Sequence, residues 1–212
     1  MPSTINKILD SFLFPTTTPI VGPPNFKTIS KLHMKLNSNA ASVQSNLGDG
    51  MLSLLYFTVF PIFYTTLSST EFVVPVNPGS EPIIPDGATG PAIADPCYSF
   101  QLAKDIFTDY DNTDKALHQI ILASVENLYV RSLCHRYIKY GRTTTHQPLN
   151  QLYAVYTNIS PVDLQLKDAR LRTPYDANHS IKTIKDQLET AVKYVAAGNA
   201  PYFSEQVVII AF

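Results

Sequence analysis

The chain has 212 residues, of which 45% are hydrophobic and only 16% are charged. This composition excludes a wholly disordered chain and is sufficient for one large domain or two small lobes. With a formal net charge of -1, the chain as a whole has no electrostatic attraction for nucleic acid.

The charges are unevenly distributed. Residues 71–126 contain two Lys/Arg against nine Asp/Glu, whereas residues 127–212 contain ten against six. An acidic middle followed by a basic end can support head-to-tail self-association between copies. The alternative is ordinary variation among solvated surfaces.

Four prolines between residues 15 and 24 predict an irregular N-terminal arm over residues 1–26. A helical spacing of apolar residues predicts a helix over 28–45, and two glycines at 48 and 50 end it. The segment 51–67 contains no charged residue, so we expect a buried helix or helix pair. A membrane anchor is the alternative, although Pro61 interrupts the segment and clustered Lys/Arg do not flank it.

Residues 72–97 are rich in proline and glycine, which predicts an extended linker or a long loop. Apolar spacing then predicts a helix from residue 99, a boundary with capping residues at 111–114, and a second helix that begins near 117 and ends between 133 and Gly141.

Further helices are predicted over 149–156, 160–172, 180–197 and from residue 204. The fold class is therefore all-α. We expect a helical N-terminal lobe over 27–142, which includes the loop 72–97, and a helical C-terminal lobe over 143–212. The chain stops inside an apolar run, so we expect this second lobe to be truncated.

No motif predicts an enzyme, a metal site or a cofactor. The glycines at 48 and 50 fit no phosphate-binding template, and no two histidines have the spacing of a local metal pair. Asp109, Asp111 and Asp114 resemble the start of a calcium loop but lack its later ligands, so we interpret them as capping or solvated residues.

The two cysteines, Cys97 and Cys134, belong to no C-x-x-C pair. Their number excludes a disulfide framework and a zinc knuckle. We expect two buried, reduced thiols in a cytoplasmic protein, because the first ten residues lack an apolar signal segment.

The one candidate binding patch is Arg131, Arg136, Lys139 and Arg142, interleaved with tyrosines and free of acids. Such a patch can neutralise phosphates and stack bases, which would make the chain an RNA-binding module. The alternative is a helix C-terminus whose cations offset the macrodipole.

Several phrases, in this order, resemble the Gag region of copia-type LTR retrotransposon polyproteins. They cover residues 18–22, 32–40, 72–79, 85–89, 93–94, 117–125, 152–156, 159–164 and 169–174. The resemblance implies a helical capsid protein that self-associates into shells around the element's RNA, with no catalytic residues. The chain departs from the family pattern in two respects: its segment 54–67 is more hydrophobic, and it lacks a zinc knuckle.

These observations leave three hypotheses. The first is a capsid-like protein whose partner is a further copy of itself, together with element RNA. The second is an RNA-binding module that uses residues 131–142. The third is a small membrane-associated protein anchored by residues 51–67.

Overall fold

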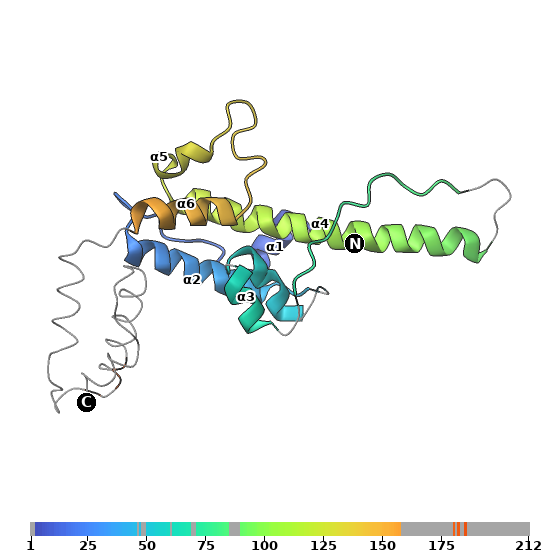
Figure 1. Ribbon diagram of the computed structural model, residues 1–212, viewed down its shortest axis with the longest axis horizontal. Helices are drawn as coiled ribbons and strands as arrows, with labels where there is room; N and C mark the ends of the chain where they lie inside the picture. Colours follow the sequence, from blue (N-terminus) through green and yellow to red (C-terminus); the bar gives the residue numbers. More distant parts are fainter. Residues whose placement is uncertain are drawn as a thin grey trace. The chain divides into compact units, whose positions relative to one another are not determined.

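The computed structural model in Figure 1 describes residues 3–45, 47, 50–59, 61–68, 71–84 and 90–157, together with 180, 182 and 185. The described part of the chain is mainly helical and contains no β-strand, which confirms the predicted all-α class. Two compact units are distinguished, Met1–Leu152 and Tyr153–Phe212. The helices predicted after residue 157 lie outside the described residues, except that Lys182 and Lys185 are helical. The proposed division into lobes at residue 142 stays a prediction.

The N-terminal segment begins with a helix, α1 (Ile5–Ser11), which Thr4 caps by accepting a hydrogen bond from the Lys7 N–H. The prediction of an irregular arm over 1–26 is therefore wrong for these residues. The reason is that the four prolines between residues 15 and 24 all follow α1, so none of them interrupts it. From Phe12 to Asn25 the chain has no helix, as predicted.

Side-chain hydrogen bonds fasten this segment to two later helices. The Asn39 amide accepts from the Phe14 N–H at 2.7 Å and donates to the Phe14 carbonyl at 2.9 Å. The Ser3 N–H donates to the Asp109 carboxylate at 2.5 Å, and Asn112 donates to the Ser3 carbonyl at 2.8 Å. Because Asn39 is fully buried, both of its polar atoms need these partners.

The helix α2 (Phe26–Ser42) confirms the helix predicted from residue 28. It begins with a capping box between Asn25 and Thr28, in which each side chain bonds the other residue's backbone N–H. The apolar spacing that predicted α2 is also its buried face, formed by Ile29, Leu32, Leu36 and Ala40.

The charge-free segment forms a 3-10 helix, η1 (Gly50–Phe57), followed by α3 (Pro61–Leu67). This confirms the predicted buried helix pair, because Leu54, Phe57 and Tyr64 are each at most 3% exposed. Two histidines hold the end of η1. His33 on α2 donates to the Thr58 carbonyl at 2.7 Å, and His146 donates to the Tyr56 carbonyl at 2.5 Å. Among the described residues, no helix combines the length and the apolar character that a membrane crossing requires.

The helix α4 (Pro91–Ser124) is the longest described element and corrects two predictions. The linker 72–97 ends at residue 90, because Pro91 occupies a first-turn position where its missing N–H is tolerated. The predicted boundary at 111–114 does not exist, because its capping side chains have other partners. Asp111 pairs with Lys115, and Thr113 donates to the Asp109 carbonyl one turn earlier.

After α4 the chain turns at Val125, so the predicted continuation of this helix to residues 133–140 is wrong. Two short elements follow, α5 (Asn127–Val130) and the 3-10 helix η2 (Arg131–Leu133). The helix α6 (His146–Tyr156) then confirms the helix predicted over 149–156. The core of the first unit lies between α1, α2, η1 and the second half of α4, where Leu117, Ile120 and Ile121 are buried.

Two histidines, one half-buried and one buried, predict how stability depends on pH. Burial lowers the pKa of His33 and of His118, so both are neutral in the folded chain at pH values where the unfolded chain, with a pKa of about 6.5, takes up protons. We therefore expect the free energy of unfolding in urea to fall as the pH decreases from 7.5 to 5.5. The double variant His33→Gln/His118→Gln should lose part of this dependence, whereas the exposed His135→Gln should keep all of it. An unchanged slope in the double variant would contradict this assignment.

Candidate functional site

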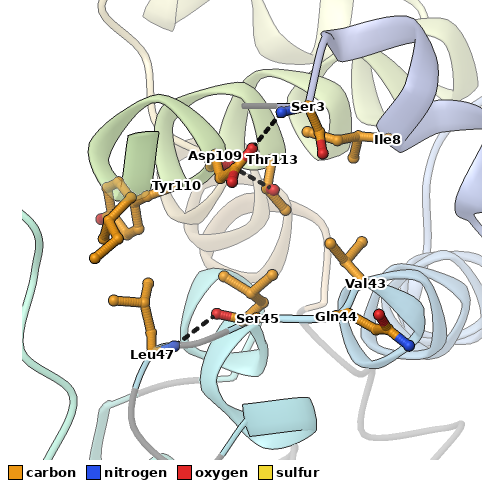
Figure 2. Close-up of a pocket in the computed structure, with 11 residues that line it drawn as sticks. Ser3, Ile8, Val43, Gln44, Ser45, Leu47, Asp109, Tyr110 and Thr113 are labelled. Carbon is orange, nitrogen blue, oxygen red and sulfur yellow. Dashed lines mark hydrogen bonds between the residues drawn. The ribbon is translucent and has the colours of Figure 1, made fainter. Parts of the chain in front are cut away.

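Polar residues that could suggest an enzyme have structural partners. The described residues contain no group of three His, Cys, Asp or Glu side chains that could hold a metal ion. A pocket of about 280 Å³ lies between α1, the segment after α2, and α4 (Figure 2). It is lined by Asp109 and Tyr110, and the Asp109 carboxylate accepts a hydrogen bond from the Ser3 N–H. Burial, followed by the nearby Asp114, raises the pKa of Tyr110 to about 12, which keeps the phenol protonated. The Thr113 hydroxyl, which also lines the pocket, donates to the Asp109 carbonyl.

The predicted binding residues Arg131, Arg136, Lys139 and Arg142 lie together in one exposed loop, which we call the basic loop (residues 131–142). All four cations are exposed, and none forms an ion pair within the part of the chain that the structure describes. Only Arg131 lies in a helix, the short η2. The alternative reading of these cations as the end of a long helix is therefore wrong.

The basic loop is folded as a small hairpin. The N–H of His135 donates to the Lys139 carbonyl at 2.8 Å, and the Lys139 N–H donates to the His135 carbonyl at 2.9 Å. Lys139 has a φ of +49°, the left-handed residue that a three-residue hairpin loop requires. A lysine in this conformation costs about 1–2 kcal/mol, so the loop holds Lys139 in a backbone conformation that lysine disfavours. The hairpin places Arg136 and Tyr137 at its tip, with the guanidinium 5.5 Å from the ring centroid.

The basic loop is anchored on α4. The Asp114 carboxylate accepts from the Thr145 N–H at 2.9 Å, and the Thr145 hydroxyl donates to the Asp114 carbonyl at 3.0 Å. One turn later, the His118 ring lies edge-on to the Tyr140 ring, with centroids 6.1 Å apart. Thr145 is fully buried, so these contacts fix the end of the loop while its cations stay in solvent.

A second exposed surface is the first half of α4, which we call the α4 extension (residues 91–105). Figure 1 shows this part of α4, in green, continuing past α1, α2 and α3. Residues 94–99 are all exposed, and the large apolar side chains of Tyr98 and Leu102 are 71% and 46% exposed. Pro96 lies inside this uncovered stretch and cannot donate to the carbonyl four residues before it.

The chain that leads to α4 is also exposed, and we call residues 71–84 the proline strap. Phe72 anchors it by stacking on Tyr56, with ring centroids 4.3 Å apart. Beyond Phe72 the strap has no regular secondary structure, as expected for a proline-rich segment. Its apolar side chains face solvent, and Val76 and Ile83 are 81% and 96% exposed.

The two cysteines lie on the α4 extension and on the basic loop. Cys97 is on the α4 extension and Cys134 is in the basic loop, and both are free and exposed. The prediction of two buried thiols is therefore wrong. It relied on the general preference of free cysteine for the interior, and it could not foresee that the first turns of α4 are uncovered.

Removing the anchor of the basic loop gives a prediction. In Asp114→Ala the buried N–H of Thr145 loses its acceptor, which should lower the free energy of unfolding by about 1–3 kcal/mol. Amide hydrogen exchange in residues 131–145 should accelerate more than in α2. The control is Asp111→Ala, which removes only the exposed ion pair with Lys115 and should change stability by less than about 0.5 kcal/mol. Equal exchange in the two variants would show that Asp114 does not anchor the loop.

No protein-family model, curated protein or solved structure matches the chain. Its function is therefore inferred from the fold and from the two exposed surfaces.

Proposed function

We propose that the chain is a structural, self-assembling protein of the Gag capsid type. The observation that carries this proposal is the exposure of large apolar side chains on two segments, the α4 extension and the proline strap. Five large apolar residues there, Val73, Val76, Ile83, Tyr98 and Leu102, are between 46% and 96% exposed. Monomeric proteins seldom expose such a concentration of apolar side chains unless it is a binding surface.

The α4 extension needs a partner for a second reason. A helical stretch without tertiary contacts is marginal in water, and an internal proline costs it about 3 kcal/mol more. Pro96 is in such a stretch, among neighbours that are all exposed. Contact with another protein surface would bury the apolar side chains and stabilise the helix at the same time. The all-helical fold and the resemblance to Gag sequences both support a further copy of the chain as that partner.

Assembly predicts particles whose size depends on concentration. Light scattering behind size exclusion, with negative-stain images of any large peak, should show a rise in mass above the 23.5 kDa monomer as the protein concentration increases. The double variant Tyr98→Gln/Leu102→Gln keeps good helix formers but removes exposed apolar area, so it should assemble more weakly. Met34→Gln, which changes an exposed residue of α2, is the matched control. A monomer at every concentration would refute the proposal.

The basic loop favours a second candidate function, the binding of RNA. Residues 127–145 contain four cations and no acid, and the exposed Tyr137 offers a ring on which a base could stack. These cations could follow the phosphates of a single strand without any structural rearrangement, because the described part of the chain already leaves them unpaired.

Four phosphate contacts set the salt dependence of RNA binding. A plot of log affinity against log salt concentration should have a slope of about -3 for a single-stranded RNA. Changing Arg131, Arg136, Lys139 and Arg142 to Ala should abolish this slope, whereas Lys27→Ala and Lys31→Ala on α2 should leave it unchanged. Binding that ignores both salt and these substitutions would exclude the basic loop as an RNA site.

A further inference from the structure

We propose that the basic loop of one copy docks on the α4 extension and proline strap of a second copy, so that the chain associates head to tail. This inference rests on the proposed self-assembly and specifies the two surfaces that meet. The occupant of the uncovered apolar surface is thus a second copy of this chain, presented through its hairpin.

The charges of the two surfaces are complementary. The basic loop has four exposed cations, and no acid occurs between residues 127 and 145. On the other surface Glu71, Glu81 and Asp95 are exposed and Asp105 is half-buried, against the single cation Lys104. Opposite fields of this kind select a partner and its orientation, while two basic loops or two α4 extensions would repel each other.

The apolar side chains are complementary as well. Tyr137 and Ile138, beside the cations of the loop, are 79% and 43% exposed. Tyr98, Leu102 and Ile83 are exposed on the same two segments as the acids of the other surface. A phosphate backbone would pair with the cations but would not bury Ile138. A protein surface with both acids and apolar groups satisfies the whole loop, which favours protein over RNA as its partner.

Within a single chain, the basic loop cannot dock on the α4 extension. The loop is fastened to α4 at Asp114, and Tyr98 lies 16 positions earlier on the same helix, which is roughly 24 Å along its axis. Figure 1 shows the loop, after α5, near the other end of α4 from the α4 extension. The contact must therefore join two copies through different surfaces. Such a heterologous contact repeats from copy to copy and produces rings, filaments or shells.

The two cysteines provide a direct test, because Cys97 and Cys134 mark the two surfaces and are the chain's only thiols. One full-length variant carries Cys134→Ser and keeps only Cys97, and the other carries Cys97→Ser and keeps only Cys134. A short bifunctional maleimide should give no cross-linked dimer with either variant alone. An equal mixture of the two should give a dimer, and the unaltered chain should give a ladder.

Two outcomes of the cross-linking test would overturn the inference. A dimer formed by the Cys97 variant alone would show that two α4 extensions meet symmetrically. No cross-link in the mixture, although light scattering shows assembly, would place the contact elsewhere and would leave self-assembly intact. A monomer in light scattering would instead remove the proposed function together with this inference.

Charge reversal tests the same contact independently. The loop variant Arg136→Glu/Lys139→Glu and the variant Glu81→Lys/Asp95→Lys should each assemble about tenfold or more weakly than the unaltered chain. Mixing the two should restore assembly, because each altered surface then meets an opposite charge. Circular dichroism checks that both variants fold. Failure of the mixture to recover, or assembly that nuclease disperses and that only the loop variant weakens, would overturn the inference and indicate RNA as the loop's partner.

Discussion

The continuity of α4 through residues 111–114 is the constraint on which the rest of the structure depends. If a helix ended at residues 111–114, as the capping residues there suggested, the residues before that break could fold back onto the core. Because the helix instead continues, the apolar side chains near Leu117 fix the direction of everything before them. The core and the uncovered surface are therefore two halves of one continuous helix. The exposure of Tyr98 and Leu102 follows from the packing of residues more than one turn away.

Buried and half-buried polar side chains hold irregular backbone segments in place. Asn39 pairs with both polar groups of Phe14, two histidines hold the end of η1, and Asp114 holds Thr145. In each case the side chain supplies the partner that an irregular backbone segment lacks, and buried backbone groups need such partners. Consequently the residue types that suggest catalysis in a sequence are committed here to fastening loops onto helices.

Much of the fold could be predicted from apolar spacing, and the errors share a physical cause. The stripe of Ile29, Leu32 and Leu36 predicts α2 because it is the face that packs. Capping residues are ambiguous, since Asp111 and Thr113 stabilise a helix end only when no side chain or carbonyl competes for them. Those competitors include Lys115 and the carbonyl of Asp109, and for the neighbouring Asp114 the distant Thr145.

Only part of the candidate site could be predicted from the sequence. Composition identifies the four cations of the basic loop, but a hairpin with a left-handed Lys139 has no glycine or asparagine to announce it. The uncovered α4 extension has no signature at all. Its apolar residues have the spacing of a buried helix face, and only the tertiary structure shows that nothing in the described first unit covers them.

The length of α4 also gives it the properties of a lever. From Thr113, where the buried part of the helix begins, to Pro91 is 22 positions, or roughly 33 Å. A change of about 10° in how α4 packs on α2 would move the tip by roughly 6 Å, and packing angles of related helices commonly scatter by that much. In an assembly joined through this tip, curvature would be set by the volume of side chains in the core. Substitutions at buried positions such as Leu117 would then alter the radius of a particle without touching any surface at which its subunits meet.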